Sequence, residues 1–466
     1  MNLSQATASD LLNALTDRQM SAQEVMQQTL ERIGGVNEAA NAIVALRERD
    51  DLMAEARALD AGPIRGPLHG LPIAVKDLVN VAGIVTSQGS PIFRDHVAQR
   101  DDLIAARMRA AGAILIGKTN VPEFGLGSHT FNPVHGATTN PYNPARTCGG
   151  SSGGAAVALA TGMVALADGS DAMGSLRNPA AWNNVYGFRP SWGRVPSEPV
   201  GDGFLHQLST LGPMARSPED LGLLLDVISG PDVRQPFGGA TPIVSPVQAA
   251  DMRGVRIGWL DDWGGAYPFE DGVHAQCESA LNVFTQLGAE VIPVAPPFEA
   301  ERLWESWITL RSWSVAASLA PLADQRDVLK DTAQWELDLG QTLTAMQVHE
   351  ASVIRSEWFR CLAELMRDYD AMVLPSAQVW PFEIETPYPT EIAGRGMDTY
   401  HRWMEVMVPV SLIGLPCLSA PAGFGANGLP MGIQVFGPRG SDARILSIGA
   451  AYHAATMWPQ KRPAQP

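Results

Sequence analysis

Serine and lysine side chains in the first 180 residues have the types and surroundings that nucleophilic acyl transfer requires. Ser151 lies in the glycine-rich run TCGGSSGG, and Ser175 follows a glycine in the segment GSDAMGSLRNPAA. Lys76 is the single charge at the end of the apolar run LPIAVK. Burial lowers the pKa of a lysine at a strand end, and the neutral amine then serves as a base toward a serine hydroxyl. Amides of a helix that starts near Pro179 would face the oxyanion formed when Ser175 attacks a carbonyl.

Each of these residues also has a purely structural interpretation. A glycine- and serine-rich run often forms a flexible linker, a serine before a helix often caps it, and a lysine at a strand end often reaches solvent. The position of TCGGSSGG argues against a linker, because the run lies between the turn-rich segment TTNPYNPART and a stretch typical of a buried helix. For Ser175 and Lys76, the residues alone leave both interpretations open.

Other catalytic chemistries lack their characteristic patterns in this chain. None of the nine histidines sits in a recognisable triad context, and there is no HExxH sequence. The four cysteines are scattered without a CxxC pair or a metal-ligand spacing. We therefore expect no metal and no cofactor, and we expect free thiols in a reducing cytoplasm.

Charge and hydropathy patterning exclude two classes of partner. The formal net charge of −16 argues against binding to nucleic acid or to an anionic membrane surface. The N-terminal segment has no basic region followed by an apolar core, so we expect no signal peptide. Residues 406–424 carry no charge, but three prolines would break a spanning helix there, and buried strands and turns are the better interpretation.

The elements that must position these side chains alternate between helix and strand. Two amphipathic helices are expected at the start, and the second opens with the capping box of Ser21 and Glu24. A buried helix is predicted at residues 155–167, and the Gly/Pro-rich stretch 229–249 is predicted to be a surface loop within one unit. This alternation is typical of an α/β protein. The predicted strands are residues 68–79, 111–120, 254–260, 289–294 and 370–376.

Together these segments resemble the amidase signature family. The motifs GPLHGLPIAVKDLVNVAG, GAILIGKTNVPEFGLGS, CGGSSGGAAVALATG, GSDAMGSLR and PAAWNNVYGFRPSWGRV follow its core in order and spacing. The resemblance covers roughly residues 5–228 and 405–450. It implies an α/β fold with a large mixed central β-sheet covered by helices on both faces. It also implies a single domain over residues 1–466, with a divergent substrate-pocket region at about 230–400.

The resemblance assigns a catalytic set of two serines and a lysine. By motif position, Ser175 corresponds to the nucleophile, Ser151 to the bridging serine in a cis peptide, and Lys76 to the base. We therefore expect a cis bond between Gly150 and Ser151, with the Ser151 hydroxyl in hydrogen-bonding distance of both Lys76 and Ser175. The oxyanion hole is expected to consist of the backbone amides of Ala172, Met173, Gly174 and Ser175.

Other positions follow the family's pattern less closely. Met173 stands where the family usually has a glycine, and its side chain is expected either to pack under the loop or to narrow the acyl pocket. Gly125 and Leu126 match a loop that lines the acyl site in a family member, so a substrate contact and simple turn geometry are both open. Most tryptophans between residues 304 and 403 are expected in the core, with one or two lining a pocket.

The sequence as a whole predicts an amidase. The expected substrate is a small aryl or alkyl carboxylic amide, cleaved through a seryl acyl-enzyme in the cytoplasm. One alternative is a hydrolase of a related carbamate, hydrazide or urea-type bond, and another is the glutaminase subunit of a tRNA-dependent amidotransferase. The expected partner is the small-molecule amide alone, without nucleic acid or membrane, and a homodimer is left open.

Overall fold

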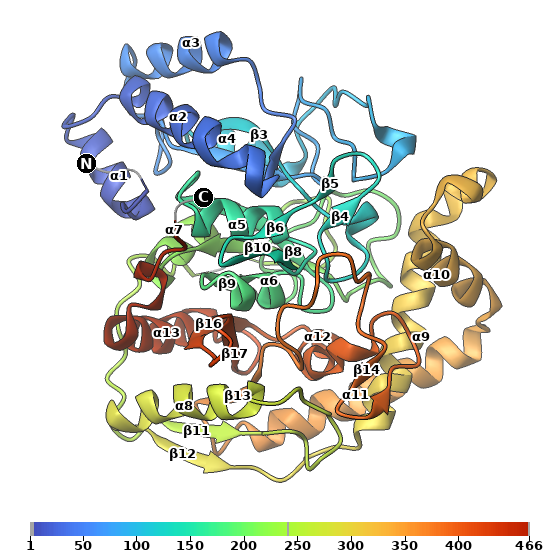
Figure 1. Cartoon of the computed structure of the whole chain (residues 1–466). Helices are drawn as coiled ribbons and strands as arrows, with labels where there is room; N and C mark the ends of the chain where they lie inside the picture. The colour runs from blue at the N-terminus through green and yellow to red at the C-terminus, as the bar shows by residue number, and fades with distance from the viewer. Residues whose placement is uncertain (1–3, 240–241, 465–466) are drawn as a thin grey trace.

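Helices and strands alternate along the chain in the computed structural model, which describes residues 4–239 and 242–464 (Figure 1). The α-helices are α1 (Ala8–Thr16), α2 (Ala22–Ala40), α3 (Arg49–Asp60), α4 (Leu103–Ala110), α5 (Gly153–Ala160), α6 (Arg177–Trp182), α7 (Pro218–Ile228), α8 (Val273–Gln286), α9 (Ala300–Leu319), α10 (Asp331–Thr342), α11 (Ala345–Leu365), α12 (Val408–Ile413) and α13 (Asp442–Thr456). Short 3-10 helices are η1 (Pro91–Phe93), η2 (Glu123–Gly125), η3 (Ala320–Val328), η4 (Arg402–Met407) and η5 (Trp458–Gln460).

The strands belong to one large sheet, one three-stranded sheet and several two-stranded ones. They are β1 (Ile43–Val44), β2 (Pro72–Lys76), β3 (Ile114–Thr119), β4 (Phe131–Asn132), β5 (Gly136–Ala137), β6 (Thr139–Asn140), β7 (Asn143–Thr147), β8 (Leu166–Asp171), β9 (Tyr186–Arg189), β10 (Thr210–Ala215), β11 (Arg256–Trp259), β12 (Glu290–Pro293), β13 (Ala371–Pro375), β14 (Glu391–Ile392), β15 (Arg395–Gly396), β16 (Cys417–Phe424) and β17 (Pro430–Phe436).

The large sheet is mixed and has eight strands in the order β12-β11-β13-β17-β16-β9-β10-β8. Strand β11 runs parallel to β12 and β13, whereas the pairs from β13 to β8 are antiparallel. The three-stranded sheet has the order β1-β3-β2 and adjoins β8, because the Lys76 amide of β2 donates to the Asp168 carboxylate of β8 at 3.0 Å. The predicted α/β class with a large mixed sheet is confirmed.

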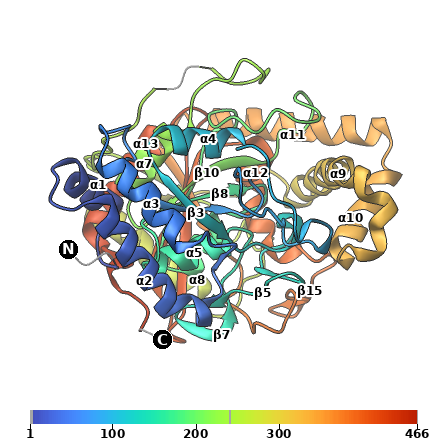
Figure 2. The same ribbon diagram turned by 90° about the horizontal axis from the view of Figure 1, so that it is seen from above.

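Helices cover both faces of this sheet, as predicted. Successive residues of a strand point to opposite faces. In β16, Ser419 donates to the Arg177 carbonyl of α6 at 2.7 Å, whereas Leu418 packs so closely on α13 that a Cβ at Gly449 would collide with it. In the view from above (Figure 2), α1, α2 and α3 lie at one end of the molecule and α9 and α10 at the other.

Helix α9 lies in the region predicted to diverge and is fixed by buried polar contacts. Arg311 of α9 pairs with Glu336 of α10 at 2.7 Å. Ser306 of α9 donates to the Ala351 carbonyl of α11 at 2.6 Å. Buried polar groups are costly unless they are paired, so these contacts define how α9 packs against its neighbours.

The predicted elements agree with the structure in most places and are wrong in two. The capping box of Ser21 and Glu24 starts α2 as predicted. The helix predicted at 155–167 ends at Ala160, Gly162 turns the chain at φ +73°, and β8 begins at Leu166, because the small apolar residues that follow suit a buried strand equally well. The segment 406–424, predicted as strands and turns, contains α12 before β16. The predicted strands contain β2, β3, β11, β12 and β13.

Two further predictions concern the surface and the membrane. The stretch 229–249 is a loop between α7 and β11 wherever it is described, and its residues 240–241 lie outside the described ranges. Within residues 4–239 and 242–464, no helix has both the length and the apolar character that crossing a bilayer requires.

Candidate active site

Lys76 ends β2 with its side chain fully buried among serine hydroxyls. Its Nζ lies 2.8 Å from Ser151 Oγ, 2.9 Å from Ser152 Oγ and 2.9 Å from Ser170 Oγ. An ammonium group donates one hydrogen to each of three such acceptors, whereas a neutral amine keeps a lone pair that accepts from one of them. The cluster therefore accommodates both protonation states of the lysine.

Burial lowers the pKa of Lys76 from 10.5 to about 7, although the negative charges of Asp168 and Asp171 oppose the shift. Desolvation disfavours the charged form of a lysine, which is the physical cause of this change. The neutral and charged forms are therefore present in similar amounts near pH 7. Lys76 is a competent base at neutral pH, and the interpretation of a lysine that reaches solvent is wrong.

The loop that carries Ser151 is held on several sides. The peptide bond between Gly150 and Ser151 is cis, as predicted. The Gly150 carbonyl accepts from Ser128 Oγ at 2.8 Å, and its amide donates to Asn178 Oδ1 at 3.3 Å. Gly149 has φ +78°, and its carbonyl accepts from Thr130 Oγ1 at 2.8 Å. TCGGSSGG is therefore a rigid, buried loop and not a linker.

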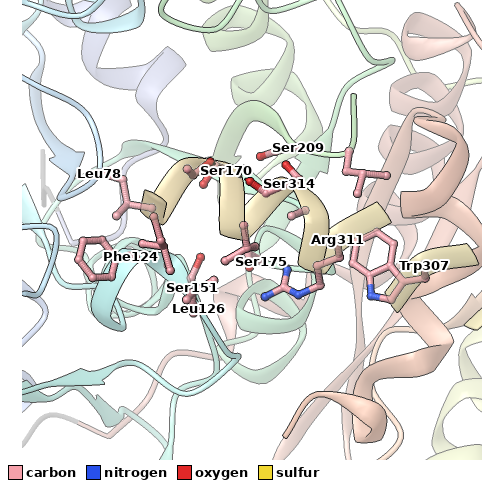
Figure 3. A pocket seen from close by; sticks show the side chains of 16 residues that line it. Leu78, Phe124, Leu126, Ser151, Ser170, Ser175, Ser209, Trp307, Arg311 and Ser314 are labelled. Atoms are coloured by element: carbon pink, nitrogen blue, oxygen red, sulfur yellow. Dashed lines mark hydrogen bonds between the residues drawn. The ribbon is translucent and has the colours of Figure 1, made fainter. Parts of the chain in front are cut away.

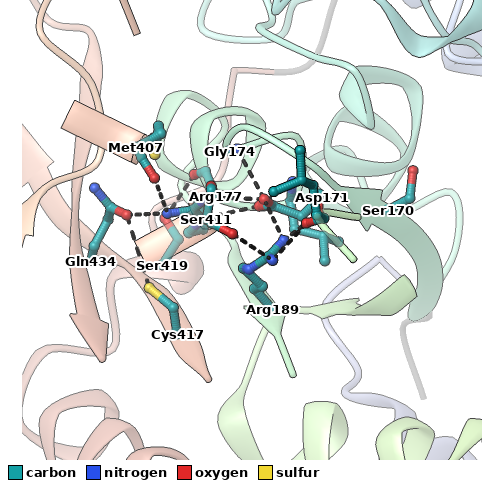
Figure 4. A network of polar contacts seen from close by, with 12 residues as sticks. Ser170, Asp171, Gly174, Arg177, Arg189, Met407, Ser411, Cys417, Ser419 and Gln434 are labelled. Carbon is teal, nitrogen blue, oxygen red and sulfur yellow. Dashed lines mark hydrogen bonds and ion pairs between the residues drawn. The ribbon is translucent and has the colours of Figure 1, made fainter. Parts of the chain in front are cut away.

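The turn that carries Ser175, between β8 and α6, is organised by a buried carboxylate (Figure 4). Asp171 accepts hydrogen bonds from the amides of Gly174 at 2.9 Å and Leu176 at 3.1 Å. It also pairs with Arg177 at 2.9 Å and with Arg189 at 3.2 Å. Burial alone would raise the pKa of Asp171, but the two guanidinium groups hold it well below its usual range. The carboxylate thus stays ionised and fixes the turn.

The predicted oxyanion hole needs one correction. The Gly174 amide is already bonded to Asp171, so it is not available to an oxyanion. The amides of Ala172, Met173 and Ser175 have no acceptor within the described residues. Gly174 contributes through its conformation instead, because φ is +86° and a Cβ there would lie 2.7 Å from the Met407 side chain.

The predicted relay also needs a correction. Ser151 contacts Lys76 as expected, but no hydrogen bond joins the hydroxyls of Ser151 and Ser175 in the part of the chain that the structure describes. The Ser151 hydroxyl is turned toward the lysine, while Ser175 faces a cavity and is 9% exposed. The two segments are joined through the backbone, where the Ser152 amide donates to the Ser175 carbonyl at 3.1 Å.

Ser151 and Ser175 open onto one cavity of about 230 Å³ (Figure 3). Gly125 lies beside Ser151, where a Cβ would approach the Ser151 hydroxyl to 3.4 Å and Leu78 to 2.8 Å. Its lack of a side chain therefore keeps the space next to the serine open. The cavity is lined by Leu78, Phe124, Gly125, Leu126, Ser151, Ser170, Ala172, Ser175, Leu208, Ser209, Trp307, Arg311, Ser314, Val315, Ser318 and Leu319.

The Met173 side chain does not line this cavity. Its side chain is 3% exposed and packs in the hydrophobic core, and its φ is not in the left-handed region. Of the two interpretations, packing under the loop is confirmed. Gly125, Leu126 and Ala172 lie in the cavity lining as expected, whereas Gly174 does not.

Sequence reasoning missed part of the site. Ser170, at the end of β8, contacts the lysine directly and stands in the same segment as Ser175. Helix α9 supplies Arg311 and Ser314, and its Trp307 confirms the prediction that a tryptophan of the divergent region lines a pocket. The spacing of four and three residues places these three side chains on one helix face. That spacing was visible in the sequence, but nothing there indicated that the face would lie opposite β8. No group of side chains suited to hold a metal ion occurs among the described residues.

A buried lysine among serine hydroxyls, next to a mostly apolar cavity, defines a site of the serine–lysine kind that acyl-transfer hydrolases use. Comparison with known proteins specifies the class. The Amidase family model matches residues 24–446, and the chain belongs to this family. It is an enzyme that hydrolyses amide C–N bonds other than peptide bonds.

Individual relatives match along nearly their whole length. An acylamidase of Rhodococcus erythropolis is 31% identical over 472 aligned residues, which cover 99% of this chain and 98% of that protein. A glutamyl-tRNA(Gln) amidotransferase subunit from Thermus thermophilus is 34% identical, with 94% of each chain covered. Among solved structures, a bacterial aryl acylamidase of the amidase signature family superposes with a TM-score of 0.91 at 28% identity, covering 99% of both chains.

Proposed function

We propose that this enzyme hydrolyses the C–N bond of a small aryl or alkyl carboxylic amide through an acyl-enzyme on Ser175. The observation that carries the proposal is the contact between Lys76 and Ser151 at 2.8 Å, at the edge of the cavity that Ser175 also lines. The similarity to an acylamidase and to an aryl acylamidase supports the amide bond and the aryl preference.

In the acylation step, the Ser175 hydroxyl attacks the amide carbonyl and gives its proton to Ser151. Ser151 in turn passes its own proton to neutral Lys76, whose pKa of about 7 makes this transfer feasible at neutral pH. The relay requires the Ser175 side chain to turn toward Ser151 when substrate binds. Catalytic hydrogen bonds are often long in the free enzyme and shorten in the complex.

The tetrahedral intermediate then collapses. The amides of Ala172, Met173 and Ser175 are the donors we assign to its oxyanion. The C–N bond breaks, and the relay returns the proton to the leaving amine. Water, activated by the same lysine and serine, attacks the Ser175 ester, and the carboxylic acid leaves with Ser175 regenerated.

The size and lining of the cavity support a small substrate. Ligand pockets usually enclose about 300–1,000 Å³, and this cavity of about 230 Å³ lies below that range. The side chains of Phe124, Trp307 and Val315 give it apolar walls that suit an aryl or alkyl group. The net charge of −16 supports a small-molecule substrate over a nucleic acid. We place the enzyme in the cytoplasm, with four free cysteines.

Two alternatives use the same catalytic residues. Cleavage of a carbamate, hydrazide or urea-type bond would differ only in the atoms beside the carbonyl. A glutaminase role within an amidotransferase is suggested by the relative from Thermus thermophilus. A free glutamine substrate would bring an ammonium and a carboxylate into the site. Arg311 is the only charged side chain in the cavity lining among the described residues, so the lining offers no anionic partner to the ammonium.

The test is a comparison of substrates on the purified enzyme and on its Ser175→Ala variant. Anilides, short alkyl amides, glutamine, carbamates and hydrazides are offered at equal concentrations, and amine or ammonia release is measured. We expect the anilides and alkyl amides to give the highest kcat/KM, with all turnover lost in Ser175→Ala. Preferred turnover of glutamine, or of a carbamate, would replace the proposal by the corresponding alternative.

A further inference from the structure

Arg311 is held in the cavity wall with two of its three guanidinium nitrogens already used. Nε donates to Glu336 Oε1 at 2.7 Å, and Nη2 donates to the Tyr400 hydroxyl at 2.8 Å. Nη1 has no hydrogen-bond partner within the described residues, and Figure 3 shows the guanidinium directed into the space beside Ser175. The N–H groups of Nη1 are therefore left for a ligand.

The contacts behind the guanidinium prevent it from turning away. Glu336 is fully buried and accepts further hydrogen bonds from Ser312 Oγ and from the Tyr400 hydroxyl, both at 2.7 Å. Arg311 and Tyr400 are 8% and 7% exposed. A buried polar network in which each member is paired restricts the rotamers of all its members. The position of Nη1 is thus fixed before any substrate binds.

This arrangement selects the kind of group that Nη1 can receive. Burial would raise the pKa of Glu336, but Arg311 holds it below its usual value, so the carboxylate is ionised and balances the guanidinium charge. A substrate carboxylate normally takes two parallel N–H donors from one arginine edge. Here the N–H of Nε and one of the two N–H groups of Nη2 are occupied. Their acceptors, Glu336 and the Tyr400 hydroxyl, are hydrogen-bonded to each other and therefore lie on the same edge, so Nη1 and the second N–H of Nη2 are left on the other edge. Because the Glu336 carboxylate already balances the guanidinium charge, a substrate carboxylate would bring an unbalanced negative charge into this buried site, whereas an uncharged acceptor brings none.

We propose that Arg311 is a specificity-determining residue that donates one hydrogen bond, from Nη1, to an uncharged acceptor on the substrate. The preferred substrates are small amides with a second neutral acceptor, such as an ether, nitro or second carbonyl oxygen, at a fixed position relative to the scissile bond. This inference rests on the proposed amidase function and specifies its substrate class.

The test uses matched anilides that differ in one group. The ether oxygen of methoxyacetanilide replaces a methylene of butyranilide, and succinanilic acid carries a carboxylate instead. A second series places methoxy, ethyl or carboxylate groups on the aryl ring. In the wild-type enzyme, we expect the ether member of at least one series to exceed its methylene counterpart in kcat/KM by about 10- to 100-fold, the usual effect of a hydrogen bond from a charged donor. The carboxylate member should be the poorest.

Two variants connect this preference to Arg311. Removing Arg311 alone would leave Glu336 buried and unpaired, so the double variant Arg311→Met/Glu336→Gln removes both charges together. In this double variant, we expect the ratio of kcat/KM between the ether and the methylene substrate to fall to about 1. The single variant Glu336→Gln leaves the cavity wall positively charged, and we expect its kcat/KM for the carboxylate members to rise relative to the wild type.

The control is another arginine–glutamate pair of the same helix. Arg302 of α9 pairs with Glu357 at 2.5 Å on a half-exposed surface outside the cavity. In Arg302→Met/Glu357→Gln, the ether preference should be unchanged. Thermal unfolding and fluorophosphonate labelling of each variant report whether the fold and the nucleophile are intact.

Three results would overturn the inference. They are equal turnover of ether and methylene substrates by the wild type in both series, a preference that survives in the double variant, and a wild-type preference for the carboxylate members. If no anilide is hydrolysed and Ser175 is not labelled, the proposed function itself fails and the inference with it. If Ser175 is labelled but the ether and methylene substrates have equal kcat/KM, only the proposed role of Arg311 is refuted, and the proposed function stands.

Discussion

The pKa of Lys76 should determine how the acylation rate depends on pH. Because the proposed base is the neutral amine, the rate follows the deprotonated fraction of the lysine and rises with pH. With a pKa of about 7, half of the molecules carry the neutral base at pH 7. With the unperturbed pKa of 10.5, about 0.03% would. Burial of Lys76 thus increases the active fraction at neutral pH by on the order of 10³-fold.

The assay is kcat/KM for an anilide from pH 5.5 to 9.5, together with the rate of fluorophosphonate labelling over the same range. We expect both rates to fall about tenfold per pH unit well below pH 7 and to level off above pH 8. In Lys76→Met, we expect kcat/KM to fall by at least about 10³-fold, with no inflection near pH 7 in the residual rate.

Glu405 provides the matched control for this experiment. Burial raises its pKa to about 7 as well, but it pairs with Arg402 and does not line the cavity. Glu405→Gln should therefore keep the inflection. A flat pH profile, an inflection near 10.5, or an inflection that disappears in Glu405→Gln and persists in Lys76→Met would refute this role of the lysine.

Further predictions address the two serine segments and metal dependence. Ser151→Ala should lower kcat by about 10²- to 10⁴-fold, whereas Ser152→Ala, which also removes a hydroxyl from Lys76 but does not line the cavity, should have a smaller effect; equal losses would contradict the relay. Gly174→Ala should destabilise the fold by about 1–3 kcal/mol in chemical denaturation, more than Gly428→Ala, because both positions have positive φ but only Gly174 faces the Met407 side chain. Dialysis against EDTA should leave kcat unchanged, because lysine and serine side chains carry each proton transfer; a loss that added metal restores would contradict this.

The sequence predicted the site best where neighbouring residues in the chain restrict the local conformation. Lys76 follows an apolar run that predicts a buried strand, and the strand β2 is buried as the pattern indicates. The run alone did not decide between a buried lysine of lowered pKa and a lysine that reaches solvent. The glycines around Ser151 indicated a loop that ordinary residues cannot form, and the structure has a cis bond there. In both places the local pattern reduced the number of interpretations, and the family resemblance supplied the base role of Lys76 and the cis bond before Ser151.

Long-range contacts explain what the sequence could not provide. The segment of β8 has glycine and serine in place of β-branched residues, and it is a strand because β10 pairs with it over its whole length. The sequence does not show whether the Gly174 amide is free to bind an oxyanion. In the fold, this amide donates to the Asp171 carboxylate. Arg311 became part of the site only when α9 was packed opposite β8. The single domain over residues 1–466 stays a prediction, and so does the homodimer that the sequence left undecided.

The most direct test of the account is to locate the covalent adduct. The enzyme is incubated with a fluorophosphonate, digested, and the modified peptide is identified by mass spectrometry in the wild type and in Ser175→Ala. The account predicts one adduct, on Ser175, and no adduct in the folded Ser175→Ala variant. An adduct on Ser151, Ser152 or Ser170, or labelling that survives in Ser175→Ala, would contradict it.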